Sequence, residues 1–525
     1  MKKLLPFALL LFLTNSCFLS NPDYDTLILD GIVFDGVELS EKPQDVGVKD
    51  GRIIAIGNLS GKSGRRTIDL GGDQIISPGF IDMHTHIEKI MELPQAESVI
   101  RQGVTTVLAG PDGGGPSPMG KFLDRLETYD IGINTAWLVG HNTIRRNVMG
   151  TENRAPTLDE LEQMKSAVKE AMDNGAFGIS TGLKYLPGAF SKVDEVIALS
   201  TVAANQGGIY TSHLREEGLG LIAGVKEAMI IGREANIPII LTHHKAVGRP
   251  MWGSSVTTLN MADSARKAGI DVMIDQYPYT ASFTGLSILI PSWAMAGGQS
   301  EFKKRIDNPE TRARIHKEIV FNIENDRGAA DLSAVQFAFV DWKPDLNGKT
   351  LKDWALEKGL EPTFSNGADL VIEGQLNGGA GCIFHAINEE DVKRIMRHPL
   401  TMIASDGRMA VPGEGHPHPR SYGTFPRVLG HYVRDEKTLD LALALRKMTS
   451  MPAERLGLSD RGFIKEGMQA DITIFNPNTI NEVGTFEDPH HYPEGISYVM
   501  VNGQMAYAPF EKLTDARAGM VLRKK

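Results

Sequence analysis

Strand-like and helix-like patterns alternate through residues 80–455, and this alternation limits the fold more than any other feature. Apolar segments of strand length lie at 80–84, 104–109, 133–139, 176–181, 208–212, 237–242, 271–276 and 400–404. Helical patterns separate most of them, and the clearest begins at Thr157, a candidate N-cap with Glu160 three residues on, and runs to about Asn174. Repeated βα units in this number predict an α/β fold, a parallel (β/α)8 TIM-like barrel. The stretch 285–370 is too long for a barrel loop, so we expect an insertion before the last strand.

Short β-patterns flank this middle region on both sides. They occupy about 22–79 and return in about 456–512, for example in Asp471-Ile472-Thr473-Ile474-Phe475. Asp30-Gly31 and Asp50-Gly51 are typical of hairpin turns between the first strands. We therefore expect a small β-sandwich domain that is built from both ends of the chain.

The first 17 residues have the pattern of a bacterial lipoprotein signal peptide. Two lysines precede an apolar run at 4–13, which is too short to span a bilayer, and Leu13-Thr14-Asn15-Ser16-Cys17 resembles a lipobox. The sequence thus predicts export, lipidation of Cys17, and a place on the periplasmic or cell-surface side of a membrane, held by the lipid anchor alone. Cys382 is the one other cysteine, so no disulfide is expected in the mature chain. An ordinary secretory signal with an incidental cysteine is the alternative.

The overall charge argues against one class of partner. The formal net charge is −10 and the pI is near 5.8, and the basic residues form no cluster beyond the short tail at 523–525. A nucleic-acid-binding surface is therefore not expected.

Side chains that bind metals recur where the predicted strands end. In a barrel enzyme these positions meet at one face, where the chemistry takes place. In His84-Thr85-His86 the two imidazoles point to the same side of an extended chain. The residues that follow later strands are Asp112, Lys184 with Tyr185, His213, His243 with His244, and Asp406. Such a set predicts a metal site, and zinc accepts imidazole and carboxylate ligands.

Several motifs resemble the amidohydrolase superfamily, and within it the D-aminoacylase (N-acyl-D-amino-acid deacylase) family. They include Pro78-Gly79-Phe80-Ile81-Asp82-Met83-His84-Thr85-His86, Ser180-Thr181-Gly182-Leu183, Ser405-Asp406-Gly407, His418-Pro419-Arg420 and Pro452-Ala453-Glu454-Arg455-Leu456-Gly457. The resemblance covers nearly the whole chain after the signal. It implies that His84, His86, His213, His243 and Asp406 form a zinc site, with His243 preferred over His244, and that Asp406 is also the general base.

The chain departs from this family at one expected ligand. D-aminoacylases carry a zinc-binding cysteine after the second strand, whereas this chain has Gly110-Pro111-Asp112-Gly113 there. Asp112 could supply an oxygen ligand instead. Alternatively, Lys184 could be carboxylated and bridge two ions, as in related dihydroorotases, and this alternative is preferred because Lys184 ends the corresponding strand. One or two zinc ions are thus expected.

The resemblance implies a zinc-dependent hydrolase that cleaves N-acyl-D-amino acids to a carboxylate and a free D-amino acid. The amino-acid carboxylate needs cationic or hydroxyl partners, and the candidates at the barrel mouth are Lys245, Tyr185, Tyr277, Tyr279 and Arg420. A cyclic amidase or dipeptidase with the same metal site, or an inactive surface-binding lipoprotein, are the alternatives. A serine hydrolase is disfavoured, because the Gly-x-Ser-x-Gly match at Ser180 is not followed by a helix start.

Overall fold

A computed structural model describes residues 21–509 and 512–525. The predicted signal peptide and Cys17 lie outside these residues. Within the described part of the chain, no helix is both long enough and apolar enough to cross a membrane.

Eight parallel strands form the barrel, as predicted. They are β6 (Phe80–Asp82), β8 (Val104–Ala109), β9 (Asn134–Trp137) with its continuation β10 (Val139–Gly140), β11 (Gly178–Gly182), β12 (Ile209–His213), β13 (Ile239–Leu241), β14 (Val272–Gln276) and β18 (Thr401–Ile403). Each pairs in parallel with the next. The ring closes where β7 (Thr85–His86) pairs with β19 (Gly407–Arg408), beside the hydrogen bond from the Asp406 amide to the His84 carbonyl at 2.8 Å. Closure therefore brings the first and last predicted ligands together.

Helices cover the outside of the barrel. They are α1 (Glu97–Ile100), α2 (Met119–Leu126), α3 (His141–Met149), α4 (Leu158–Asp173), α5 (Val193–Ala204), α6 (Leu221–Glu234), α7 (Ser255–Lys267), α12 (Glu389–Arg397), α13 (Arg420–Arg427), α14 (Leu441–Met448) and α15 (Ser450–Leu456). The capping box predicted at Thr157 and Glu160 is present at the start of α4. Neighbouring strand residues face opposite ways: Ile239 packs in the core shared with the helices, and Ile240 packs in the separate cluster of the barrel interior.

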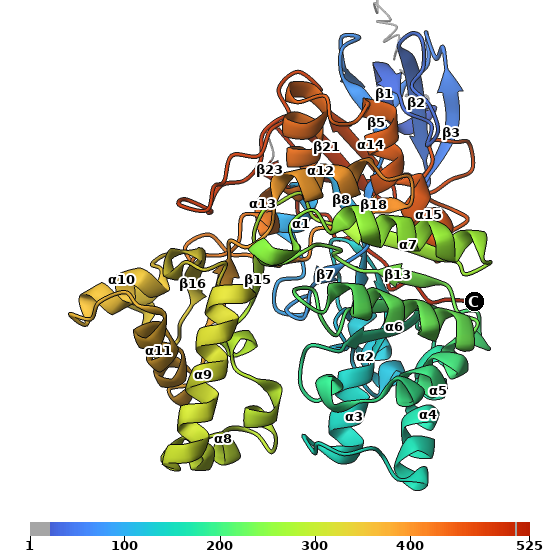
Figure 1. Cartoon of the computed structure of the whole chain (residues 1–525). Coiled ribbons are helices and arrows are strands. Elements are labelled where there is room, and N and C mark those ends of the chain that lie inside the picture. The colour runs from blue at the N-terminus through green and yellow to red at the C-terminus, as the bar shows by residue number, and fades with distance from the viewer. Residues whose placement is uncertain (1–20, 510–511) are drawn as a thin grey trace, which may run out of the picture.

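Strands from both ends of the chain form one sheet beside the barrel (Figure 1). Its N-terminal strands are β1 (Tyr24–Val33), β2 (Gln44–Lys49), β3 (Arg52–Gly57), β4 (Gly64–Asp69) and β5 (Ile75–Pro78), and its C-terminal strands are β20 (Ile472–Phe475), β21 (Ile496–Val501), β22 (Gln504–Ala508) and β23 (Lys512–Leu513). The two groups join where β5 pairs with β20. Asp50-Gly51 is the predicted turn. The prediction at Asp30-Gly31 was wrong, because this pair is a bulge inside the continuous strand β1, with Asp30 at φ 56°.

An inserted unit lies between β14 and β18 and has its own core. It contains the sheet of β15 (Ser282–Gly285), β16 (Val335–Phe339) and β17 (Gly381–Phe384), and the helices α8 (Gln299–Asp307), α9 (Pro309–Asn325), α10 (Leu351–Glu357) and α11 (Phe364–Leu376). It is wider than the expected 285–370, because β15 and β17 pair with each other and so draw both ends into one sheet. In Figure 1 its yellow helices stand apart from the green helices of the barrel.

Candidate metal centre and substrate cavity

Six side chains with metal-binding atoms converge at the carboxyl ends of the barrel strands. They are His84, His86, Asp112, His213, His243 and Asp406. Five of them were implied by the family resemblance, and Asp112 was one of two candidates for the missing ligand. The sequence therefore identified five members of this cluster and offered Asp112 as the less preferred candidate for the sixth, and the fold brings all six together.

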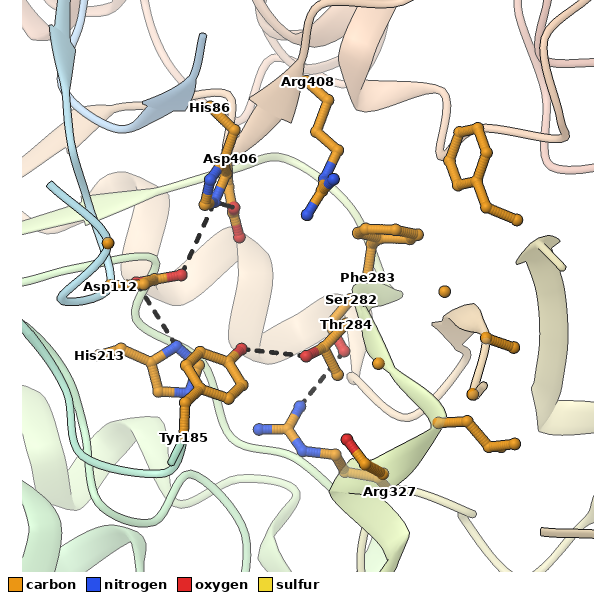
Figure 2. Close-up of a pocket in the computed structure, with 18 of the residues that line it drawn as sticks. His86, Asp112, Tyr185, His213, Ser282, Phe283, Thr284, Arg327, Asp406 and Arg408 are labelled. Atoms are coloured by element: carbon orange, nitrogen blue, oxygen red, sulfur yellow. Dashed lines mark hydrogen bonds and ion pairs between the residues drawn. The ribbon is translucent and has the colours of Figure 1, made fainter. Parts of the chain in front are cut away.

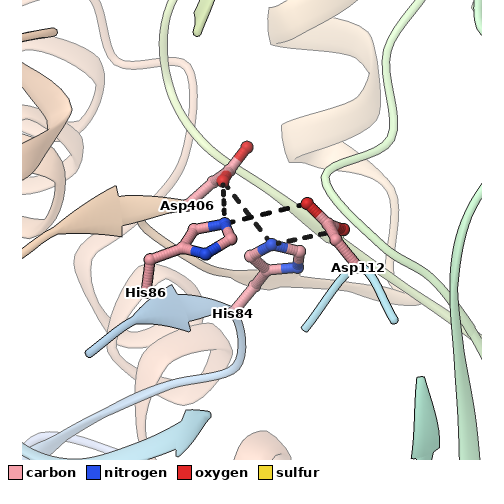
Figure 3. A group of neighbouring side chains, drawn as sticks. All are labelled: His84, His86, Asp112 and Asp406. Atoms are coloured by element: carbon pink, nitrogen blue, oxygen red, sulfur yellow. Dashed lines mark ion pairs between the residues drawn. The ribbon is translucent and has the colours of Figure 1, made fainter. Parts of the chain in front are cut away.

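The first group holds His84, His86, Asp112 and Asp406 (Figure 3). Asp406 Oδ1 lies 3.5 Å from His84 Nε2 and 3.4 Å from His86 Nε2. Asp112 lies 3.7 Å from each of the same two nitrogens. The four ligand atoms thus surround one point.

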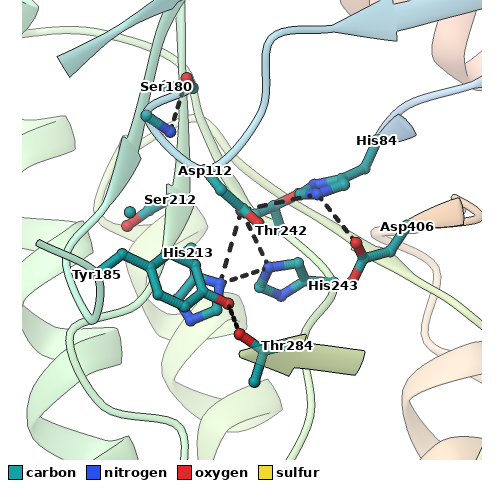
Figure 4. Close-up of polar contacts among 12 residues, drawn as sticks. His84, Asp112, Ser180, Tyr185, Ser212, His213, Thr242, His243, Thr284 and Asp406 are labelled. Carbon is teal, nitrogen blue, oxygen red and sulfur yellow. Dashed lines mark hydrogen bonds and ion pairs between the residues drawn. The ribbon is translucent and has the colours of Figure 1, made fainter. Parts of the chain in front are cut away.

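The second group holds Asp112, His213 and His243 (Figure 4). Asp112 Oδ1 lies 3.2 Å from His243 Nε2 and 3.6 Å from His213 Nδ1, and these two nitrogens are 2.9 Å apart. Asp112 belongs to both groups, so its carboxylate is placed to bridge two ions.

The spacing of these atoms fits metal binding. Around a tetrahedral zinc ion with bonds of about 2.0–2.2 Å, neighbouring ligand atoms lie roughly 3.3–3.6 Å apart. The separations in both groups run from 2.9 to 3.7 Å and so bracket this value. In addition, His84 Nε2 is buried and has no hydrogen-bond partner among the described residues, as expected for an atom that would instead bind a metal.

Backbone geometry at three of the ligands is unusual. Asp112, His243 and Asp406 have φ of 54°, 36° and 48°, a left-handed region that residues other than glycine seldom adopt. Such conformations persist at functional sites when the surroundings hold them. At Asp112 the holding group is Ser180, whose hydroxyl donates to the Gly110 carbonyl at 2.6 Å and accepts from the Gly113 amide at 3.1 Å. Ser180 thus supports the loop that carries Asp112. Its hydroxyl is buried and engaged in these two hydrogen bonds, which agrees with the expectation that Ser180 is not the nucleophile of a serine hydrolase.

Electrostatics keep both acidic ligands ionised. Burial opposes ionisation of Asp112, but the imidazoles of His84, His243 and His213 outweigh it and hold its pKa well below the usual value. Burial likewise opposes ionisation of Asp406, and the Arg420 guanidinium, 2.9 Å from its Oδ2, is the main group that lowers its pKa. Both carboxylates are therefore available as ligands.

A second layer of hydrogen bonds orients the histidines. Asp275 accepts from the Thr242 hydroxyl at 2.7 Å and from the His243 amide at 2.5 Å, and Thr242 Oγ1 lies 2.6 Å from His84 Nδ1. These contacts fix which nitrogen of His84 faces the centre.

Glu217 was not given a role from the sequence, yet it is the most connected side chain behind the second group. Its carboxylate accepts from Lys245 Nζ at 2.5 Å and from Arg327 Nη2 at 2.6 Å. It also faces His243 Nδ1 at 3.2 Å and His213 Nε2 at 3.4 Å, the nitrogens on the far sides of the two rings from Asp112. The sequence could have indicated Glu217 through its spacing of four residues from His213. It offered no comparable indication of Arg327, which comes from the inserted unit.

A cavity of about 720 Å³ opens in front of the cluster (Figure 2). Its lining includes the predicted Tyr185, Lys245 and Arg420. The predicted Tyr277 does not line the cavity, but its ring lies behind it, 5.6 Å from Lys245 Nζ and 4.6 Å from the Arg420 guanidinium carbon. Its hydroxyl is buried without a hydrogen-bond partner among the described residues. These groups can receive an anionic ligand.

Besides Tyr277, two expected site residues lie outside the cavity lining. Lys184 donates to Glu216 at 2.7 Å and does not line the central cavity, so Asp112 and not Lys184 stands among the histidines. Tyr279 donates to Glu482 at 2.5 Å and packs against His418, also away from this cavity. The physical reason is the same in both cases. A nearby carboxylate, Glu216 for Lys184 and Glu482 for Tyr279, accepts a hydrogen bond from the side chain and holds it away from the cavity.

Two other residues considered as metal ligands, His244 and Cys382, lie outside both groups. His244 is buried and lies 2.8 Å from Thr258 Oγ1, so His243 is the histidine in the cluster. Cys382 is buried in β17, and no cysteine joins either group among the described residues.

Comparison with known proteins gives a consistent result. The amidohydrolase family model matches residues 327–507. The chain is 34% identical to a D-aminoacylase from Alcaligenes xylosoxydans xylosoxydans, over 95% of this chain and 97% of that protein, and 34% identical to an N-acyl-D-glutamate deacylase of the same organism, over 95% and 96%. The crystal structure of an N-acyl-D-glutamate deacylase from Bordetella bronchiseptica, in complex with zinc and a phosphonate inhibitor, superimposes with a TM-score of 0.81 at 32% identity, over 95% of this chain and 99% of that one.

Proposed function

Because the chain belongs to the amidohydrolase family and, within it, to the D-aminoacylases, we propose that it hydrolyses N-acyl-D-amino acids to a carboxylate and a free D-amino acid. The observation that carries the proposal is the joint placement of two ligand groups and two buried cations, Lys245 and Arg420, at one cavity. An amide substrate with a carboxylate beside its nitrogen needs both features.

We propose zinc as the metal, in one or two sites joined by Asp112. His84, His86 and Asp406 would hold one ion with Asp112, and His213 and His243 would hold the other. The bound metal supplies a water of lowered pKa and polarises the scissile carbonyl. In this proposal the Asp112 carboxylate takes the place of the thiolate of the relatives, and Lys184 stays an uncarboxylated amine.

The residues of the chain perform the proton transfers. Asp406 takes the proton of the attacking water, since its carboxylate is ionised and faces the ligand nitrogens. It then delivers this proton to the departing amine nitrogen. Arg420 holds Asp406 in place through its 2.9 Å ion pair.

Lys245, Tyr277 and Arg420 would bind the carboxylate of the amino acid. Lys245 and Arg420 are buried cations. Their carboxylate partners, Glu217 and Asp406, lie beside the histidines of the metal centre. The Tyr277 ring lies near both cations, and its hydroxyl lacks a partner in the described part of the chain. A buried donor without a partner is costly, so a ligand that accepts from it is favoured.

The test is amine release from matched N-acetyl-D- and N-acetyl-L-amino acids by the purified, zinc-loaded protein. Release from the D-substrates alone is the expected result. No release from either set, together with hydrolysis of a cyclic amide or a dipeptide, would overturn the proposal.

We further propose export and lipid anchoring through Cys17, from the sequence pattern alone. Metabolic labelling with a fatty acid tests it: label in the wild-type protein and none in Cys17→Ser is expected. An unlabelled wild-type protein would refute lipidation.

A further inference from the structure

A second cavity, of about 980 Å³, adjoins the central one and lies between the inserted unit and the loops that follow β11 and β12. The two cavities share four lining residues: Tyr185, Thr284, Gly285 and Ser287. At this junction the Tyr185 hydroxyl lies 3.1 Å from Thr284 Oγ1, and the Tyr185 ring lies 4.4 Å from that of His213 (Figure 4). We call the second cavity the side groove. It begins directly beside the metal ligands.

The wall that the inserted unit contributes to the side groove carries a group of apolar side chains among polar ones. It comes from the short helices η3 (Leu286–Leu289) and η4 (Ser292–Met295) and from α9. Its apolar members are Ile288, Ile290, Pro291, Trp293, Met295 and Phe321. Phe321 is 51% exposed, so its ring is accessible to a molecule in the groove.

Charged residues at the rim are paired within the protein. Arg314 donates to Glu318 at 2.9 Å and stacks over Trp293 at 4.1 Å. Lys184 donates to Glu216 at 2.7 Å. Lys317, a further cation of the lining, is exposed on α9 and can stay in water. The groove therefore favours an apolar occupant over a charged one.

The position of Asp406 decides which end of the substrate faces the groove. Asp406 lines the central cavity and a third cavity, lined also by Arg408 and Met409, but not the side groove. Because Asp406 protonates the leaving amine, the amino-acid half of the substrate lies on its side of the centre. The acyl half then extends the opposite way, past Tyr185.

We infer that the side groove binds an extended aliphatic acyl chain, so that the preferred substrates are N-acyl-D-amino acids with medium to long acyl groups. This inference rests on the proposed deacylase activity and adds the acyl specificity. The chain would pass over Gly285, where the absence of a side chain leaves the junction open.

The first experiment measures kcat/KM for one D-amino acid carrying acyl groups of two to ten carbons. Burial of one methylene contributes about 0.8 kcal/mol, which corresponds to a rise of up to about fourfold per methylene. A rise that continues beyond four carbons is expected. A flat or falling profile, with the acetyl substrate cleaved, overturns the inference and leaves the deacylase proposal standing. No cleavage of any member would instead refute the deacylase proposal.

Gly285→Leu tests the path. Gly285 has φ −70° and ψ 146°, an extended conformation that leucine adopts without strain, and a Cβ there would meet only Ser287 Oγ at 3.3 Å and the Ala380 carbonyl at 3.9 Å. The added side chain would therefore fill the junction without disturbing the backbone. We expect the ratio of decanoyl to acetyl kcat/KM to fall by at least about tenfold.

Phe321→Asp tests the wall independently, and Leu356→Asp is its matched control. Leu356 is 53% exposed, on α10 of the same inserted unit, and does not line the groove. The ratio should fall in Phe321→Asp and stay at the wild-type value in the control. If instead these changes alter the preference among amino-acid side chains on acetyl substrates, the groove holds that side chain and the inference is wrong.

Discussion

Replacing Glu217 by glutamine should weaken metal binding even though Glu217 touches no metal. Its carboxylate faces His213 Nε2 at 3.4 Å and His243 Nδ1 at 3.2 Å, on the far sides of both rings from Asp112. It is therefore placed to orient both rings, together with Lys245, whose Nζ lies 2.7 Å from His243 Nδ1. Loss of such a partner typically reduces metal affinity about 10–100-fold.

The same change should also destabilise the fold. Lys245 and Arg327 are both buried and share Glu217 as their carboxylate, at 2.5 and 2.6 Å. Glutamine converts one acceptor to a donor that would face an ammonium or guanidinium group. Breaking a buried charge network in this way costs about 3–5 kcal/mol.

Glu216→Gln is the matched control for this prediction. Glu216 is the adjacent residue, its side chain is 41% exposed, and its ion pair with Lys184 is worth at most about 1 kcal/mol. The assays are zinc affinity by competition with a chelator and the urea midpoint of the metal-free protein. Wild-type zinc affinity in Glu217→Gln would refute the orienting role.

Three further predictions concern the chemistry and the pH dependence. Asp406→Asn should abolish turnover even in protein that still holds zinc through Asp112 and the four histidines, because the amide cannot take a proton from water; residual activity above about 1% in zinc-loaded protein would contradict its role as base. Lys245→Met should raise KM far more than Tyr279→Phe, since Tyr279 is held by Glu482 outside the cavity; equal effects in steady-state kinetics would contradict this assignment. Burial lowers the pKa of Lys447 to about 7, so the unfolded chain binds an extra proton above pH 7 and up to about 10. Stability should therefore rise with pH in that window, by at most about 1.4 kcal/mol per unit, and Lys447→Met should remove this rise in urea unfolding followed against pH.

The barrel could be predicted because its signals are local. Each strand is a short apolar run, and all eight lie within two residues of their predicted positions, including the first, at Phe80–Asp82, and the last, at Thr401–Ile403. The capping box of α4 is likewise a local signal, because Thr157 and Glu160 lie only three positions apart. The pair Asp30-Gly31 shows the limit of such signals, because a turn dipeptide and a bulge use the same left-handed conformation and differ only in the pairing of distant strands.

The sequence by itself determined the types of ligand and their order, since parallel strands deliver their carboxyl ends to one face of a barrel. Tertiary structure alone placed Asp112, and not Lys184, among the histidines, because the direction of a side chain beyond a strand end depends on the loop backbone and on nearby partners. It also brought Arg327 to Glu217 across 110 residues and turned Tyr279 toward Glu482. These contacts are set by how the inserted unit and the strands pack, and no local pattern in the chain encodes that packing.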